Sequence, residues 1–105
     1  MILQKPTIPV GSTKTSTEEM QLKMYGRVQG VFFRVTVQKW ASELGLTGYA
    51  KNLVGGGVLI VAQGEREKLL ELQEKCSKGP PRGHIMRMEE QWRKPQQRYS
   101  TFSIH

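Results

Sequence analysis

The spacing of apolar side chains changes from a period of two to a helical period across residues 26–34. Before this stretch, methionine and leucine alternate with polar residues, which predicts a half-buried strand over residues 20–28. After it, apolar residues recur three and four positions apart, which predicts an amphipathic helix over residues 34–44. Two glycines, Gly26 and Gly30, flank the change. The chain must therefore turn tightly from a strand into a helix here.

The rest of the chain repeats both kinds of pattern. We predict strands at residues 46–53, 58–62, 85–92 and 99–105, and a second helix at residues 65–77. A run of three glycines between the second and third strands predicts a hairpin. The order is strand, helix, strand, strand, helix, strand, with a short closing strand. It predicts an α+β fold, a ferredoxin-like βαββαβ sandwich with two helices on one face of a four- to five-stranded, mostly antiparallel sheet.

One face of each predicted element is apolar, and these faces define the expected core. The strand at residues 58–62 is the most apolar, so we expect it at the centre of the sheet. The expected core side chains are Met20, Leu22, Met24, Val28, Val37, Trp40, Ala41, Leu44, Leu69, Leu72, Cys76, Met86, Met88, Trp92, Phe102 and Ile104. Residues 1–19 are rich in Pro, Thr and Ser without periodicity, so we expect a flexible tail before one domain at residues 20–105.

The chain has a formal net charge of +7 and one cysteine, Cys76. Such a charge suits nucleic acid or small anionic substrates and does not decide between them. A lone cysteine cannot form an intramolecular disulfide, which favours a reducing compartment, the cytoplasm. We expect no membrane contact, because no run approaches the roughly 20 apolar residues of a spanning helix and the N-terminus lacks an apolar signal segment.

The turn itself is a candidate anion-binding site. A loop of free backbone N–H groups that leads into a helix N-terminus can hold a phosphate, and Arg34 adds a positive charge with forked donors. The residues whose backbone we expect to donate are Gln29, Gly30, Val31, Phe32 and Phe33. From the spacing alone, a plain strand-to-helix turn with a surface arginine is an equally good interpretation.

The sequence offers little other catalytic chemistry. No set of serine, histidine and acid has motif context, and His84 and His105 lack partners at metal-ligand spacing. We therefore expect no metal and no cofactor. An enzyme with this sequence would work by positioning its substrate and by neutralising charge.

Two stretches carry a family resemblance. Residues 26–34, Gly-Arg-Val-Gln-Gly-Val-Phe-Phe-Arg, closely resemble the acylphosphatase signature Gly-x-Val-Gln-Gly-Val-x-Phe-Arg. Residues 44–52, Leu-Gly-Leu-Thr-Gly-Tyr-Ala-Lys-Asn, resemble the second signature of that family, which has an asparagine at the position of Asn52. The likeness runs from Met20 to Ile104, so the domain is expected to be acylphosphatase-like.

The resemblance implies metal-independent hydrolysis of the carboxyl–phosphate bond in small acyl phosphates, which gives a carboxylate and inorganic phosphate. It implies that the loop amides and Arg34 hold the phosphoryl group and that Asn52 orients the attacking water. From its position alone, Asn52 is better interpreted as a strand-end residue that caps a turn. Phe32 occupies a position where the family has glycine or phenylalanine, and a ring there would narrow the pocket or line it with an apolar wall.

A basic RNA-binding module is the main alternative, because the RNA-recognition fold shares this strand order. Such a sheet stacks bases on aromatic side chains of its central strands, and residues 58–62 contain none. We therefore do not expect nucleic acid as a partner. A catalytically inactive phosphate-binding relative stays open, because binding and turnover use overlapping residues. We expect a monomer that takes a small acyl phosphate as substrate and releases inorganic phosphate.

Overall fold

The structure is a computed structural model that describes residues 17–30, 32–79 and 83–105. Its elements in chain order are strand β1 (Glu18–Arg27), helix α2 (Phe33–Glu43), strands β2 (Thr47–Asn52) and β3 (Val58–Gly64), helix α3 (Arg66–Lys78), and strands β4 (His84–Arg93) and β5 (Phe102–Ile104). Every element that the apolar pattern predicts is present, and all but the last have bounds within two residues of those expected. The closing strand is shorter than predicted, Phe102–Ile104 and not residues 99–105. Most of the expected tail, residues 1–16, lies outside the described residues.

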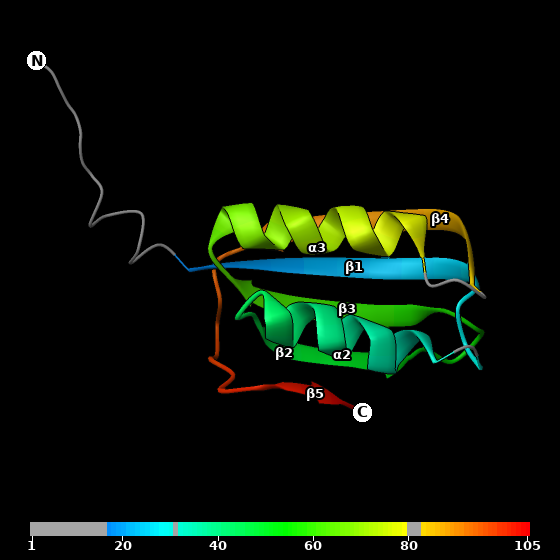
Figure 1. Ribbon diagram of the computed structural model, residues 1–105, viewed down its shortest axis with the longest axis horizontal. Helices are drawn as coiled ribbons and strands as arrows, with labels where there is room; N and C mark the ends of the chain where they lie inside the picture. The colour runs from blue at the N-terminus through cyan, green and yellow to red at the C-terminus, as the bar shows by residue number, and fades with distance from the viewer. Residues whose placement is uncertain (1–16, 31, 80–82) are drawn as a thin grey trace, which may run out of the picture.

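Five strands of the described chain form one sheet, in the order β4-β1-β3-β2-β5. Neighbouring strands are antiparallel except β2 and β5, which are parallel. Both helices cover the same face, α3 over β1 and β4 and α2 over β2 and β5 (Figure 1). This arrangement confirms the predicted ferredoxin-like sandwich, with β3, the most apolar strand, at its centre.

The core lies between the sheet and the two helices. Alternation along β1 places Met20, Leu22 and Met24 on the side that faces the helices, with no exposed surface. The buried helix residues are Phe33, Val37 and Ala41 from α2, and Leu69, Leu72 and Cys76 from α3. Trp40 and Leu44, also expected in the core, are partly buried and pack against it. The helical spacing therefore predicted most of the buried stripe of each helix, but it did not include Phe33.

The prediction that Met86 lies on the buried face of β4 is wrong. A β-bulge shifts the register of β1 and β4 between Tyr25 and Gly26, and Met86 becomes the extra residue of β4. The extra residue reverses which side chains of β4 point toward the core beyond the bulge. Ile85 therefore packs against the core, and Met86 is 76% exposed. Gly26 makes the bulge possible, because its φ is +128° and a Cβ there would lie 2.2 Å from the carbonyl oxygen of His84. Alternation could not reveal the exchange, since it assumes unbroken pairing.

The sheet face opposite the helices carries a buried carboxylate, that of Glu19, which is 1% exposed. Its Oε1 accepts a hydrogen bond from Gln63 Nε2 at 2.9 Å, and its Oε2 accepts from Gln21 Nε2 at 2.9 Å and Arg93 Nε at 2.6 Å. Gln63 Nε2 also donates to the main-chain oxygen of Gln97 at 2.7 Å. This Glu19 cluster therefore ties the connection between β4 and β5 to the sheet.

The protonation of Glu19 follows from these contacts. Burial raises the pKa of the carboxylate, but hydrogen bonds from Gln63, Gln21 and Arg93 and the charge of Arg93 outweigh burial. The pKa of Glu19 consequently lies below its ordinary value.

Glu19 belongs to β1, which begins at Glu18, two residues before the start that the alternation predicts.

Candidate active site

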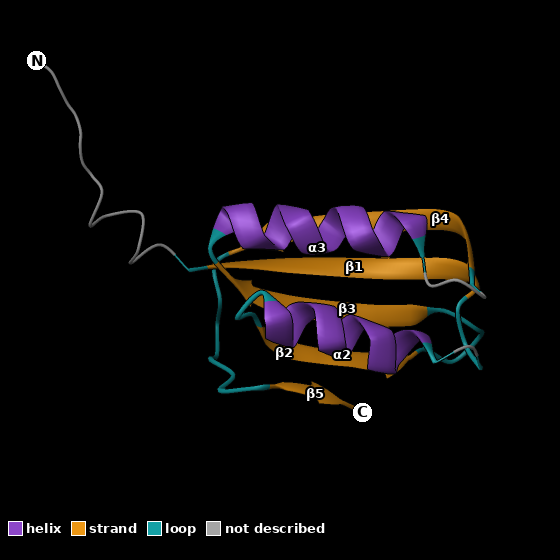
Figure 2. Ribbon diagram, viewed as in Figure 1, coloured by secondary structure: helices purple, strands orange, loops and turns teal. Residues whose placement is uncertain are grey.

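The turn between β1 and α2 lies at the same end of the sheet as the loop between β2 and β3 (Figure 2). The side chain of Gln29 connects them, because its Nε2 donates to the main-chain oxygens of Leu53 at 3.0 Å and Gly57 at 2.7 Å. The backbone N–H of Leu53 also donates to the oxygen of Gly57, at 2.7 Å, and closes the β2–β3 loop. The end of β2 is thereby fixed beside the start of α2.

The N-terminal end of helix α2 has no capping side chain among the described residues. The first turn of the helix contains no acidic residue. The first amides of a helix lack intrahelical partners and carry the positive end of the helix dipole, so an anion placed there is stabilised. The N-cap is Phe32, whose carbonyl oxygen accepts from Thr36 N–H at 3.0 Å and Thr36 Oγ1 at 2.9 Å.

Arg34, in the first turn of α2, is held by the far end of the chain. Its Nη1 donates to the main-chain oxygen of His105 at 2.7 Å. The backbone N–H of His105 in turn donates to the oxygen of Ala50 in β2, at 2.9 Å. The guanidinium therefore lies beside β2 with further donors available to a ligand. This contact of His105 was not predicted, because no local signal in the sequence joins residues that are 71 positions apart.

A cavity of about 330 Å³ opens where these segments meet. Its lining residues are Val28, Gly30, Phe32, Phe33, Arg34, Val35 and Asn52. The structure thus brings most of the predicted site residues to one cavity. Gln29 is not among the lining residues, since its side chain bridges the two loops, and Val31 lies outside the described residues. Val28 and Val35 were not predicted, although each lies next to the predicted stretch or within its helix.

The charge of the cavity suits an anion. Of the described residues that line it, Arg34 alone carries a formal charge, and none is a carboxylate that would repel a phosphate. Asn52, the last residue of β2, adds a neutral amide that can both donate and accept. Within the described ranges there is no group of three or more His, Cys, Asp or Glu residues that could hold a metal ion.

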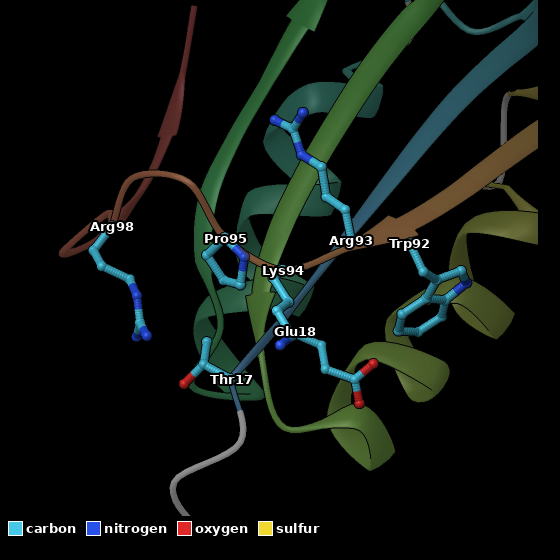
Figure 3. Close-up of a pocket in the computed structure, with 7 residues that line it drawn as sticks. All are labelled: Thr17, Glu18, Trp92, Arg93, Lys94, Pro95 and Arg98. Atoms are coloured by element: carbon cyan, nitrogen blue, oxygen red, sulfur yellow. The ribbon is translucent and has the colours of Figure 1, made fainter.

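A larger cavity, of about 610 Å³, lies at the opposite end of β1 (Figure 3). It is lined by Thr17, Glu18, Trp92, Arg93, Lys94, Pro95 and Arg98. Two of its charged side chains are engaged elsewhere, since Glu18 pairs with Arg66, and Arg93, which points away from Glu18 in Figure 3, pairs with Glu19 at 2.6 Å. No predicted site residue lines it, so volume alone does not identify the site.

The fold and the cavity define a small α+β protein of ferredoxin-like architecture with an anion-suited cleft at its β1–α2 turn. The chain belongs to the acylphosphatase family, whose model matches residues 20–104. This finding confirms the expected family and the expectation of a hydrolase. No helix in the described part of the chain is long and apolar enough to cross a bilayer.

Individual relatives agree with the family model. The chain is 44% identical over 80 residues to an acylphosphatase of Dehalococcoides mccartyi, covering 75% of this chain and 88% of that protein. It is 36% identical over 101 residues to an acylphosphatase of Koribacter versatilis, covering 93% and 92%. Among solved structures, the chain is similar to an acylphosphatase from Coxiella burnetii, with 38% identity and a TM-score of 0.79 over 85% of this chain and 93% of that one. It is also similar to an acylphosphatase from Bacillus subtilis, with 31% identity and a TM-score of 0.81 over 84% of this chain and 98% of that one.

Proposed function

We propose that the chain hydrolyses the carboxyl–phosphate bond of small acyl phosphates without a metal ion and releases a carboxylate and inorganic phosphate. One observation carries the proposal: Arg34 from the start of α2 and Asn52 from the end of β2 line one cavity beside a free helix N-terminus. Membership of the acylphosphatase family supports the class of reaction.

The phosphoryl group is held by the backbone amides of residues 29–33 and by the guanidinium of Arg34. Phosphoryl transfer mainly requires that charge on the phosphoryl oxygens be stabilised, and these donors supply that stabilisation. The hydrogen bond from Arg34 to His105 orients the guanidinium before a substrate arrives, which lowers the entropic cost of binding. The bridge made by Gln29 keeps the loop beside Asn52.

The reaction transfers the phosphoryl group to water. The oxygen of a water molecule forms a bond to phosphorus while the bond from phosphorus to the acyl oxygen breaks, and the electron pair stays on the departing carboxylate. One proton of the water passes to a phosphoryl oxygen, and the other stays on the oxygen that attacked. A carboxylate is a weak base and leaves without a general acid, so no acidic side chain is needed. Asn52 accepts a hydrogen bond from the water and, being neutral, does not repel the phosphate.

We also infer that the protein acts as a monomer in the cytoplasm. Cys76 supports a reducing compartment, because it packs in the core as a free thiol. Burial raises the pKa of Cys76 to about 12, so the thiol stays protonated and takes no part in chemistry.

Hydrolysis of benzoyl phosphate in excess EDTA tests the proposed function. We expect the wild-type chain to keep its full rate, and Arg34→Ala to lose turnover by about 1,000-fold or more together with inhibition by inorganic phosphate. Arg98→Ala, which removes an exposed arginine from the other cavity, is the matched control and should behave as wild type. Absence of wild-type hydrolysis would refute the proposed activity, and phosphate binding without hydrolysis would identify an inactive relative.

A further inference from the structure

Two apolar side chains line the cavity while remaining largely exposed. Phe32 is 79% exposed and Val35 is 53% exposed, and both belong to the lining. They come from the N-cap and first turn of α2, next to Arg34. Large exposed apolar groups at the mouth of a cavity are typical of a surface that binds an apolar ligand group.

The backbone of Phe32 is strained. Its φ of 59° and ψ of 28° lie in the left-handed region, and it is the one non-glycine residue with positive φ in the described part of the chain. A bulky residue seldom adopts this conformation, in which glycine is comfortable. Hydrogen bonds from Thr36 to its carbonyl oxygen hold the strained conformation in place. Strain of this kind is characteristic of functional sites, and here it leaves an aromatic ring exposed at the cavity.

The cavity lining has a polar part and an apolar part, just as an acyl phosphate has a charged phosphoryl group and a less polar acyl group. Arg34 and Asn52 supply its polar side chains, whereas Phe32 and Val35 supply exposed apolar surface. A phosphoryl group held by Arg34 has its acyl substituent a few bonds away, within reach of the neighbouring residues of the same helical turn.

We propose that Phe32 and Val35 form the binding surface for the acyl group, and that they make the site favour acyl phosphates with an aromatic acyl group over those with a small one. This inference rests on the proposed function, because it assigns the part of the substrate that departs. The ring of Phe32 contacts the acyl group and not the reacting atoms, so it determines specificity and not chemistry.

Two substrates and two variants test the acyl surface. Asparagine tolerates the left-handed conformation, so Phe32→Asn removes the ring without adding backbone strain. We expect the ratio of kcat/KM for benzoyl phosphate to that for acetyl phosphate to fall by about 3- to 10-fold in Phe32→Asn. Val35→Asn should lower the ratio less, and Phe32→Leu should keep part of it. Met86→Gln removes a comparably exposed apolar group outside the cavity and should leave the ratio unchanged.

A binding experiment separates this inference from the proposed function. Calorimetry should show that wild type binds phenylphosphonate more tightly than methylphosphonate and that Phe32→Asn loses the preference. If wild type shows this preference but hydrolyses neither substrate, the proposed function fails and the apolar surface stands. If wild type hydrolyses both substrates and the benzoyl-to-acetyl ratio is the same in Phe32→Asn, Val35→Asn and wild type, the acyl surface is refuted.

Discussion

Arg34 and Asn52 are positioned by different parts of the structure. Arg34 is held through its Nη1 by a main-chain oxygen of His105, so its position depends on the C-terminal segment. Asn52 is exposed at the end of β2, and its position depends on the β2–β3 loop that follows it. Because Arg34 and Asn52 have different proposed roles, substitution can distinguish their contributions to binding and to turnover.

We expect Asn52→Ala to lower kcat for benzoyl phosphate by about 100-fold, because the attacking water loses its orientation. Inhibition by inorganic phosphate should stay unchanged, since the amides and Arg34 remain. Asn52→Asp should instead weaken phosphate inhibition as well, because a carboxylate repels the anion. Steady-state kinetics with phosphate as inhibitor measures both. A full rate in Asn52→Ala would show that Asn52 does not orient the water.

Two connections, the β1–α2 turn and the β2–β3 loop, meet at the candidate site. The β2–β3 loop contains Gly55, Gly56 and Gly57, which give it a high conformational entropy in the unfolded chain. Gln29 offsets that cost by donating to the oxygens of Leu53 and Gly57 from the β1–α2 turn. One side chain therefore links the β1–α2 turn, the candidate phosphate-binding loop, to the loop that follows Asn52.

We expect Gln29→Ala to lower the free energy of unfolding by about 1–3 kcal/mol, because two partly buried hydrogen bonds are lost and each carbonyl oxygen keeps only its backbone donor. It should also lower both phosphate affinity and kcat, since the two loops are no longer fixed to each other. Urea unfolding and benzoyl phosphate kinetics measure these effects. Gln91→Ala, an exposed glutamine of β4, is the control and should change neither. Unchanged kinetics in Gln29→Ala would mean that the loops keep their positions without the bridge.

At the scale of the whole molecule, the Glu19 cluster supports the site from the opposite end of the sheet. The cluster fixes the connection that leads from β4 to β5 through the bond from Gln63 to Gln97. Strand β5 is short, but it pairs with β2 and its Phe102 oxygen accepts from Gln38 Nε2 of α2 at 3.0 Å. Beyond it, His105 holds Arg34. The path of the chain after β4 thus connects a buried carboxylate to the candidate catalytic arginine.

The lowered pKa of Glu19 predicts a pH dependence of stability. Because the pKa of Glu19 is lower in the folded state than in the unfolded state, ionised Glu19 stabilises the fold. This stability is fully present above the pKa of glutamate in the unfolded chain, about 4.3, and is lost as the pH falls through the pKa of the folded state. We expect Glu19→Gln to lower the free energy of unfolding by about 2 kcal/mol at neutral pH, and this difference from wild type to shrink in acid. Urea unfolding at several pH values below 5 measures it. Glu89→Gln, an exposed carboxylate of β4, should show no such change, and a difference that stays constant in acid would contradict the assignment to Glu19.

Local sequence patterns were sufficient to predict the elements, the sandwich and the candidate residues of the anion-binding turn. Helical spacing identified the buried stripe of α2, alternation identified the inward face of β1, and the signatures singled out Arg34 and Asn52. These are local patterns, because burial on one face of a helix or strand depends on the positions of nearby residues along the chain.

The contacts between residues that are distant in sequence could be identified from the three-dimensional fold alone. The bond from Arg34 to His105 and the bridge made by Gln29 depend on segments that the fold brings together. The burial of Glu19 and the exchange of Met86 for Ile85 at the β-bulge depend on how the strands pair. A hydrogen bond or a shifted register is set by three-dimensional proximity, which no periodicity records. The tight turn at residues 26–34 can therefore be predicted from the sequence. The cavity that residues of this turn line together with Asn52 is a feature of the fold.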